Sequence, residues 1–259
     1  MPFVSPEIFA KQTIASIQEY SILSWRAIAN LFSRPRYWAD IYTQMDSIGV
    51  GSMPIVVLTG FFTGCVLALQ SATSLEAFGS VSLTGNLVAL SMVKELGPVL
   101  TGLMVSGRNA SGMASEIGSM KVTEQIDAMR ALGTDPVRKL VTPRLYATVF
   151  MLFFLTIVSD AFGIAGGALV GVSLIGLNPH SYLHESYAGL VHGDIVQGLT
   201  KPLFSGFIIA TVGCYFGLKT TGGTQGVGRA TTQAVVVSSV FIIIVDFIVS
   251  RAMIGIFGR

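Results

Sequence analysis

Five stretches of the chain are almost entirely apolar, and shorter polar connections separate them. The apolar stretches cover residues 53–74, 85–107, 145–172, 199–217 and 235–257. Each is long enough to cross a hydrocarbon core about 30 Å thick as an α-helix. Backbone N–H and C=O groups find no water in that core, so each stretch is predicted to be helical. The pattern therefore predicts an all-α polytopic membrane protein, with five transmembrane helices in one unit over residues 53–259.

The first 52 residues differ, because polar and charged side chains interrupt the apolar pattern throughout 8–48. A charge in the middle of a bilayer costs about 2.5–3.5 kcal/mol on insertion scales, which argues against a span here. Trp25 and Trp38 lie in this region beside several arginines. We therefore predict a separate N-terminal segment, residues 1–52, with an amphipathic helix in the cytoplasmic interface. A sixth span and a soluble helical arm are the alternatives, and no cleavable signal peptide is expected.

Composition agrees with a membrane protein. Hydrophobic residues make up 51% of the 259 residues and charged residues only 12%, whereas a soluble domain carries about 25% charged residues. Glycines recur at the spacing of one helical turn, at Gly60 and Gly64 and again at Gly163, Gly167 and Gly171. In lipid, this spacing lets two helix backbones approach closely, so we expect tight helix packing at these glycines.

Basic residues are distributed unevenly among the connections. Twelve of the sixteen Lys and Arg residues lie in 1–52, 108–144 and 218–232, and none lies in 75–84 or 173–198. Connections rich in Lys and Arg remain on the cytoplasmic side of a membrane. We therefore expect the N-terminus and the polar stretch 108–144 to be cytoplasmic.

A short helical pattern lies between the second and third predicted spans, at residues 122–133. Val122, Ile126, Met129 and Gly133 are spaced i, i+4, i+7 and i+11, which places them on one helical face. A helix of about ten residues is near 15 Å long, too short to cross a membrane. It is predicted to be a coupling helix on which a soluble partner docks, and an ordinary solvated loop helix is the alternative.

The ends and the contact residues of this helix are predicted from the same stretch. Thr123 is the expected N-cap, and Gly133 followed by Asp135 and Pro136 is the expected stop signal. The side chains expected at the docking surface are Val122, Glu124, Gln125, Ile126, Asp127, Met129 and Arg130.

Several ionisable residues fall within the apolar stretches, among them Lys94, Glu95, Asp160, Lys201 and Asp246. Such groups are costly in lipid and by default indicate a functional cavity or partner. Lys94 and Glu95 are adjacent and cannot face one another on a helix, so each is expected to meet another helix or an aqueous cavity. A structural ion pair between helices is the alternative for these two. Asp160 and Asp246 are expected to be structural, with Arg251 as a candidate partner for Asp246.

The chain has no motif of its own for nucleotide binding or catalysis. It contains neither G-x-x-x-x-G-K-[ST] nor H-E-x-x-H nor G-x-S-x-G. Cys65 and Cys214 are isolated within apolar stretches, and the spacing of His180, His184 and His192 does not fit a metal site. We therefore expect no cofactor, no metal, no catalytic residue and no nucleic-acid partner.

Longer motifs resemble one family of permeases along nearly the whole chain. They are KELGPV at 94–99, GR at 107–108, SEIGSMKVTEQIDAM at 115–129, DP at 135–136, PR at 143–144 and GRATTQAVV at 228–236. In number, order and placement they resemble the permeases of MCE-associated lipid ABC transporters, the MlaE/YrbE family.

The resemblance implies a homodimeric, multi-pass permease in the inner membrane of a Gram-negative-type bacterium. Such a permease moves phospholipid between the inner and outer membranes and maintains outer-membrane lipid asymmetry. Its coupling helix would dock on a cytoplasmic ABC ATPase subunit, which binds the ATP. The resemblance also implies a periplasmic ring of MCE-domain proteins, and it allows a STAS-domain protein as a further partner.

The resemblance further implies which residues border the lipid. In the family, a basic–acidic pair in the second span and a lysine early in the fourth line an outward-facing cavity between two subunits. The matching residues are Lys94, Glu95 and Lys201. No partner for these three is evident within one chain, so a lipid phosphate is expected to be attracted to the two lysines. The residues expected to contact lipid tails are Leu67, Leu75 and Phe78.

Three other readings remain open at this point. The chain could be an intramembrane lipid-modifying enzyme, an ABC permease for another apolar substrate, or a structural scaffold or channel subunit. Co-purification with an ATPase and ATP-dependent lipid movement in liposomes separate these readings.

Overall fold

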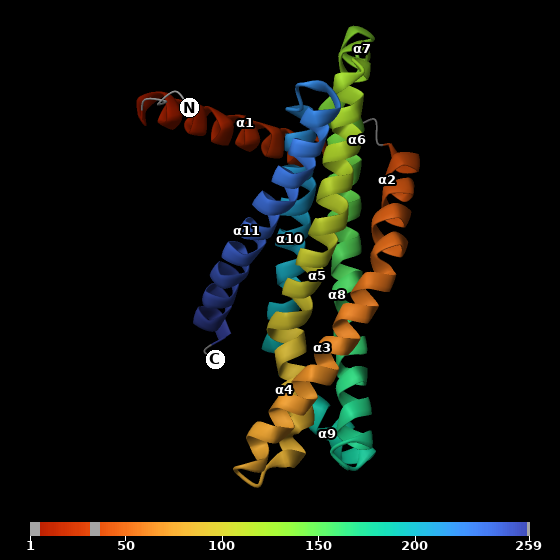
Figure 1. The fold of residues 1–259 in the computed structure, drawn as a ribbon, viewed down its shortest axis with the longest axis vertical. Coiled ribbons are helices and arrows are strands. Elements are labelled where there is room, and N and C mark those ends of the chain that lie inside the picture. Colours follow the sequence, from red (N-terminus) through yellow and green to blue (C-terminus); the bar gives the residue numbers. More distant parts are fainter. Residues whose placement is uncertain (1–5, 32–36, 258–259) are drawn as a thin grey trace.

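The computed structural model describes residues 6–31 and 37–257 (Figure 1). These residues form helices and short connections without any β-strand, which confirms the predicted all-α class. The α-helices are α1 Pro6–Leu31, α2 Trp38–Met45, α3 Gly51–Glu76, α4 Thr84–Ser91, α5 Gly97–Val105, α6 Ser111–Val122, α7 Gln125–Ala131, α8 Thr142–Ser173, α9 Pro179–Ala188, α10 His192–Leu218 and α11 Gly223–Phe257. Arg34 and Arg36 of the predicted interfacial segment lie outside the described residues.

Short turns of other helix types join several of these α-helices end to end. In the described chain the π-helical turns are Asp46–Val50, Met92–Leu96, Ser106–Ala110 and Val137–Val141, and Val81–Leu83 is a 3₁₀ turn. A π turn changes the hydrogen-bonding step without ending a helix, and such turns occur frequently at functional sites. As a result α2 runs into α3, and α4, α5 and α6 form one long helix.

Five helical segments of the described residues are long and apolar enough to cross a membrane, as predicted. They are Trp38–Glu76, Val81–Val122, Val137–Ser173, His192–Leu218 and Gly223–Gly255. Five bounds differ clearly from the predicted ones. The first segment begins well before residue 53, and the second continues through the polar residues after Arg108. The third, fourth and fifth segments begin at Val137, His192 and Gly223, before the predicted starts at 145, 199 and 235. Hydropathy marks where side chains leave the lipid, whereas a helix continues for as long as its backbone hydrogen bonds do.

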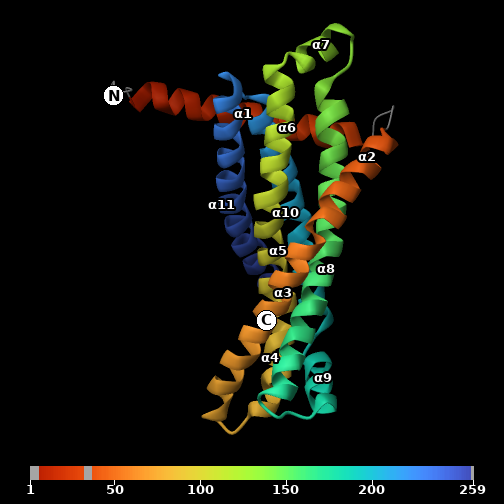
Figure 2. The ribbon, with the colours of Figure 1, turned by 45° about the vertical axis from the view of Figure 1, so that its right-hand side comes forward.

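Helix α1 lies across the other helices near one end of the bundle (Figures 1 and 2). Tyr20 of α1 hydrogen-bonds Thr211 of α10 at 2.8 Å, and Glu19 forms an ion pair with Lys219 at 2.6 Å. Trp25 is largely exposed. This orientation and this exposed aromatic side chain support the predicted interfacial helix.

Helices α3 and α8 pack with their backbones in direct contact. A Cβ atom at Gly64 would lie 1.8 Å from the carbonyl oxygen of Gly163, and one at Gly60 would lie 2.7 Å from that of Ser159. A Cβ at Gly167 would lie 2.4 Å from the hydroxyl of Tyr182. The predicted close packing at the spaced glycines is therefore confirmed.

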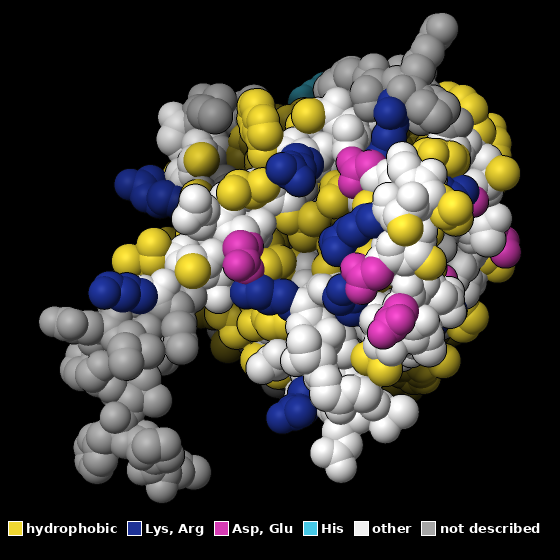
Figure 3. Space-filling model, turned by 90° about the horizontal axis from the view of Figure 1, so that it is seen from above, with side chains coloured by type: hydrophobic (Ala, Val, Ile, Leu, Met, Phe, Trp, Pro, Cys, Tyr) yellow, Lys and Arg dark blue, Asp and Glu magenta, His cyan; other side chains and the backbone are white. Residues whose placement is uncertain are grey.

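The two ends of the bundle carry different elements. The short helix α7 lies at the same end as α1 and the α10–α11 connection, whereas α9 and the turn after α3 lie at the opposite end (Figure 1). Figure 3 looks onto the α7 end and shows Lys and Arg side chains spread across it, with Asp and Glu side chains among them. The predicted basic connections are thus collected at one end.

Candidate functional site

Charged side chains from three spanning segments meet inside the bundle. We call these five residues the ion cluster: Lys94 and Glu95 of the turn Met92–Leu96, Asp194 and Lys201 of α10, and Asp246 of α11. The turn and α11 both pack against α10. The structure therefore brings together Lys94, Glu95 and Lys201, which were predicted to share a site.

Lys94 pairs with an acid at the start of α10. Its Nζ atom lies 2.9 Å from Oδ1 of Asp194. The second carboxylate oxygen of Asp194 accepts a hydrogen bond from the N–H of Val191 at 3.1 Å. A carboxylate in the first turn also interacts favourably with the helix dipole. Asp194 thus caps α10 and balances the charge of Lys94.

Lys201 is enclosed by three oxygen atoms, and its side chain is only 2% exposed. Its ammonium group donates to the carbonyl oxygen of Lys94 at 2.8 Å and to the carboxylate of Glu95. It also lies 3.0 Å from Oδ1 of Asp246. A lysine ammonium has three N–H donors. These three oxygens therefore account for its whole donor capacity.

The backbone break at Pro98 explains why Lys201 reaches the backbone of Lys94. Proline has no N–H, so in an α-helix it leaves the carbonyl four residues earlier without a donor. That carbonyl belongs to Lys94, and it accepts from Lys201. In lipid an unpaired backbone carbonyl is costly. The lysine side chain of α10 thus stabilises the π turn that carries Lys94 and Glu95.

Glu95 is the most exposed carboxylate of the ion cluster, with 44% of its side chain exposed. Gln197 of α10 donates to its Oε1 at 3.3 Å, and Ser250 of α11 donates to the same oxygen at 3.1 Å. These two hydrogen bonds and Lys201 orient the carboxylate. Its remaining surface is open to a ligand.

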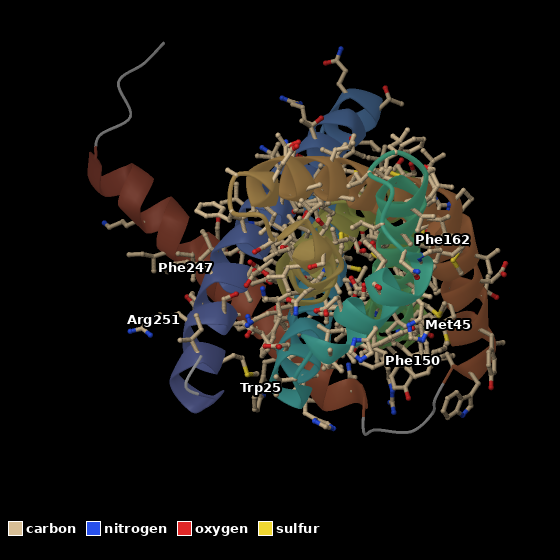
Figure 4. All side chains as sticks on the ribbon, turned by 90° about the horizontal axis from the view of Figure 1, so that it is seen from below. Trp25, Met45, Phe150, Phe162, Phe247 and Arg251 are labelled. Atoms are coloured by element: carbon tan, nitrogen blue, oxygen red, sulfur yellow. The ribbon has the colours of Figure 1, made fainter. Side chains whose placement is uncertain are left out.

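Two sequence expectations about these charges are wrong. No partner within one chain was evident for Lys94, Glu95 and Lys201, but each has one. Lys94 and Glu95 each meet another helix, α10, as was expected of them. Asp246 pairs with Lys201 and not with Arg251. Arg251 is exposed, and Figure 4 shows its side chain projecting away from the bundle. The reason is helical geometry, since residues five apart lie on different sides of a helix.

Asp160 of α8 lies beside the ion cluster but outside it. It is 8% exposed, and its Oδ1 atom is buried without a hydrogen-bond partner in the described part of the chain. A Cβ atom at Gly97 would lie 1.7 Å from this oxygen. Asp160 therefore packs against the helix of Lys94 and Glu95 at the point where that helix has no side chain.

The predicted lipid-tail residues occupy the first span and the turn that follows it. Leu67 is partly buried and packs against a core cluster that includes Met92, at the start of the turn that carries Lys94 and Glu95. Leu75 is half-buried, whereas Phe78 is 80% exposed. The C-terminal end of α3 and the turn after it lie at the end of the bundle opposite α7 (Figure 1).

An apolar cavity lies on another side of the bundle. Its volume is about 660 Å³, and Ile28 of α1, Phe150 of α8 and Phe204 of α10 are among its lining residues. Phe150 is labelled in Figure 4. None of the residues that line this cavity belongs to the ion cluster.

The short helix α7 is shorter than the predicted helix and begins differently. Thr123 follows α6, and its hydroxyl donates back to the carbonyl of Ser119 at 2.8 Å, so it is not the N-cap of α7. Glu124 precedes α7 with a left-handed φ of 59°. Gly133, with φ of 76°, ends the segment as predicted. A tight turn at residues 123–124 therefore separates α6 from α7.

The apolar face of α7 is turned toward the permease itself. Ile126 is 0% exposed and lies in a core cluster with Ile117 and Leu140, against which Met129 also packs. The expectation that Ile126 contacts a docking partner is therefore wrong. A short amphipathic helix can bury its apolar face within its own chain as readily as against a partner. The sequence expectation also missed Leu132, whose side chain is 84% exposed at the end of α7.

Polar contacts hold the exposed side of this region together. Asp127 accepts hydrogen bonds from Lys121 at 2.8 Å and from Arg130 at 3.0 Å. The hydrogen bond from Lys121, with the charge of Arg130, lowers the pKa of Asp127 below its ordinary value. Glu124 and Gln125 are exposed beside this group. Of the residues predicted to contact the docking partner, all except Ile126 and Met129 are therefore exposed to solvent.

Two of the sequence motifs explain how this end is anchored. Arg108 donates from Nη1 to the carbonyl of Ser47 at 2.9 Å and to Ser52 at 3.0 Å, and so joins the second span to the first. Arg144, 4% exposed, pairs with Glu116 at 2.9 Å and so joins the third span to α6. The end of the second span that carries α6 and α7 is therefore joined by polar contacts to the first and third spans.

Four polar residues at the ion cluster were not predicted as site residues: Asp194, Gln197, Asp246 and Ser250. The signal for two of them was present, because Asp194, Gln197 and Lys201 are spaced i, i+3 and i+7 on one helical face. Hydropathy placed the start of the fourth span at residue 199, which assigned the first two to a loop.

Comparisons with known proteins cover most of the chain. A family described as Permease MlaE matches residues 41–252. A "Probable ABC transporter permease protein" of Rickettsia bellii is 43% identical over 236 residues, 91% of each chain. The "Intermembrane phospholipid transport system permease protein MlaE" of Haemophilus influenzae is 33% identical over 249 residues, 95% of each chain. The chloroplastic "Protein TRIGALACTOSYLDIACYLGLYCEROL 1" of Arabidopsis thaliana is 34% identical over 229 residues, 88% of this chain and 65% of that protein.

Proposed function

The chain belongs to the MlaE permease family, and from this we propose that it moves phospholipid between the inner and outer membranes. It is a multi-pass inner-membrane protein and the permease subunit of an ABC transporter. ATP hydrolysis belongs to a separate ATPase subunit, and the permease transports without chemical change to its substrate. In this proposal the transport maintains the lipid asymmetry of the outer membrane.

The observation that carries the proposal is the ion cluster between the second, fourth and fifth spans. A phospholipid has a charged headgroup and apolar tails, so its path needs polar contacts at membrane depth beside apolar surface. The partly exposed carboxylate of Glu95 offers such a contact. On the same helix as Asp246 and Ser250, Phe247 and Ile248 expose apolar surface. Charged groups within spans commonly mark a substrate path.

A homodimer is part of the proposal. Phe247 is 71% exposed and Ile248 is 56% exposed, and Figure 4 shows Phe247 pointing outward from α11. An exposed apolar helix face at the edge of a polar cluster would be covered by a second copy or by lipid. We place the lipid cavity between two copies, bordered by the ion cluster and, toward the outer end, by Leu67, Leu75 and Phe78.

The end that carries α7 is proposed to be cytoplasmic, with the N-terminus on the same side. Its concentration of Lys and Arg supports this orientation (Figure 3). A cysteine placed at Ala77 should then react with a membrane-impermeant maleimide from outside the cell, and one at Thr134 should not. The reverse labelling pattern would contradict the orientation.

The ATPase subunit is proposed to bind the exposed side of α7. Gln125, Ala128 and Leu132 are spaced i, i+3 and i+7, and all three are exposed. They form one solvent-facing stripe on the side opposite the buried Ile126. The ties through Arg108 and Arg144 would transmit movement of this end to the spans. A periplasmic ring of MCE-domain proteins and a STAS-domain protein are proposed as further partners on the family resemblance alone.

Reconstitution tests the proposed function. The permease and its ATPase subunit are placed together in liposomes that carry a fluorescent phospholipid in one leaflet, and its accessibility to a quencher is followed after ATP addition. We expect movement of unmodified lipid that depends on ATP. A chemically altered lipid would indicate an enzyme, and movement of another apolar substrate only would indicate a different ABC permease. Either result would contradict the proposal.

A further inference from the structure

The ion cluster contains more negative than positive groups. Lys94 is balanced by Asp194 at 2.9 Å. Lys201 faces two carboxylates, those of Glu95 and Asp246. With every group ionised, the cluster therefore carries one negative charge that no described cation of its own helices neutralises.

Other charged groups of the neighbouring helices do not supply the missing cation. Asp160 of α8 packs against Gly97 and is itself an acid. Arg251 is the nearest cation on α11, and it points away from the bundle (Figure 4). An uncompensated charge at membrane depth is costly, so the cluster favours a cationic ligand over an anionic one.

The donor capacity of Lys201 leads to the same conclusion. Its three donors are directed to the Lys94 carbonyl, to Glu95 and to Asp246. A phosphate group could bind Lys201 only by displacing one of these oxygens. With 2% of its side chain exposed, Lys201 also offers almost no surface to an approaching headgroup.

Exposure decides which group a ligand meets first. Glu95 is 44% exposed, against 20% for Lys94 and 17% for Asp246. Gln197 and Ser250 both hydrogen-bond Oε1 of Glu95, which fixes the orientation of the carboxylate. The accessible surface of the cluster is therefore mainly an oriented carboxylate.

We propose that Glu95, with Asp246 behind it, binds the ammonium group of a zwitterionic phospholipid headgroup such as phosphatidylethanolamine. This inference rests on the proposed function and assigns it a substrate class. The ammonium donates hydrogen bonds to the carboxylate and neutralises the excess charge of the cluster. Hydrogen bonds between charged groups are shorter and stronger than neutral ones. A lipid whose headgroup is only anionic has no group that makes this contact.

A lipid-competition experiment tests the assignment. The full-length permease, in complex with its ATPase subunit, is placed in nanodiscs with equal amounts of phosphatidylethanolamine and phosphatidylglycerol of identical acyl chains. Native mass spectrometry then counts each lipid retained by the complex. We expect phosphatidylethanolamine to be retained about tenfold more, the order expected for one hydrogen bond to a charged group.

Two variants remove the excess negative charge without a large change of volume. In Asp246→Asn and in Glu95→Gln, Lys201 faces a single carboxylate, and we expect the ratio of the two lipids to fall to within about twofold of one. Asp160→Asn is the matched control, because it makes the same chemical change in a neighbouring helix outside the cluster. It should retain the wild-type ratio.

The possible failures are distinguishable. Equal retention of the two lipids by the wild-type complex would show that a proton or a second copy neutralises the cluster, and it would overturn the substrate assignment while leaving phospholipid transport intact. A wild-type preference that persists in both Asp246→Asn and Glu95→Gln would overturn it as well. Retention of neither lipid would overturn the proposed function itself.

Discussion

The ammonium nitrogen of Lys201 lies 2.8 Å from the carbonyl oxygen of Lys94, so a side chain of the fourth span completes the backbone hydrogen bonding of the second. The same nitrogen balances Glu95 and Asp246. A single lysine thereby holds three spans together at the centre of the proposed lipid path. Variants of Lys201 should therefore affect both the stability of the fold and lipid recognition.

Replacement of Lys201 should destabilise the permease strongly. Lys201→Met leaves two carboxylates without their cation, and removing one partner of a buried ion pair typically costs about 3–5 kcal/mol. Lys94→Met should cost less, because Lys94 is tenfold more exposed than Lys201, at 20% against 2%. Thermal unfolding in detergent measures both. Equal midpoints for the two variants would contradict the central position given to Lys201.

Close packing of α3 on α8 should not tolerate a methyl group at Gly64. In Gly64→Ala the new Cβ would lie 1.8 Å from a backbone oxygen of Gly163, which cannot rotate away. We expect a loss of about 1–3 kcal/mol in stability. Gly112→Ala is the matched control, since a Cβ there meets no atom of the described residues within 4 Å. The control should match the wild type or gain up to about 1 kcal/mol. Similar behaviour of the two variants would argue against backbone contact.

Binding of the ATPase subunit should depend on Leu132 rather than on Ile126. Leu132→Glu places a charge on the exposed stripe, and we expect about tenfold weaker ATPase binding by a normally folded permease, since apolar anchors dominate such contacts. Ile126→Glu should instead reduce the yield of folded protein, because Ile126 is 0% exposed. Leu174→Glu, at an exposed leucine after α8, is the control that should leave ATPase binding unchanged. Unaltered binding by Leu132→Glu would remove this stripe from the interface.

The end of the bundle that carries α9 should lose stability in alkali because of Tyr182. Burial raises the pKa of Tyr182 to about 12 from its ordinary value of 10.0. The folded state therefore keeps the phenol neutral, and its contribution is fully present below pH 10.0 and lost as the pH rises toward 12. A shift of this size corresponds to roughly 3 kcal/mol.

Hydrogen exchange of α9 between neutral and alkaline pH checks this. Tyr182→Phe should lack the alkaline loss, and it should cost little at neutral pH because the hydroxyl oxygen has no hydrogen-bond partner among the described residues. The same alkaline loss in Tyr182→Phe would assign the effect to another group.

Much of the fold was predictable because a chain that crosses lipid must satisfy its backbone hydrogen bonds internally, which leaves helices as the structure of these apolar stretches. Apolar length gave the five spans, and the spacing of Gly60 and Gly64 indicated the α3–α8 contact. Span ends were less predictable, since α6 extends as a helix through polar residues such as Lys121. The π turns are also invisible to hydropathy, although Pro98 marked the place where the backbone at Lys94 needed another donor.

Part of the candidate site followed from the cost of charge in lipid. That cost singled out Lys94, Glu95 and Lys201. Which charge meets which is decided by the rotation of one helix against another, and sequence spacing within a single helix does not determine it. Asp194 was therefore missed as the partner of Lys94. For the same reason the apolar face of α7 was assigned to a partner when it packs on the permease.

The central claim is that phospholipid passes the ion cluster and contacts Glu95. The most direct test is the rate of ATP-dependent phospholipid movement in liposomes by Glu95→Gln, compared with the wild type and with Asp160→Asn, at equal amounts of bound ATPase subunit. We expect movement at least about tenfold slower in Glu95→Gln, because a transported charge loses its carboxylate contact, and a wild-type rate in Asp160→Asn. Wild-type movement by Glu95→Gln in a complex that still hydrolyses ATP would contradict the account.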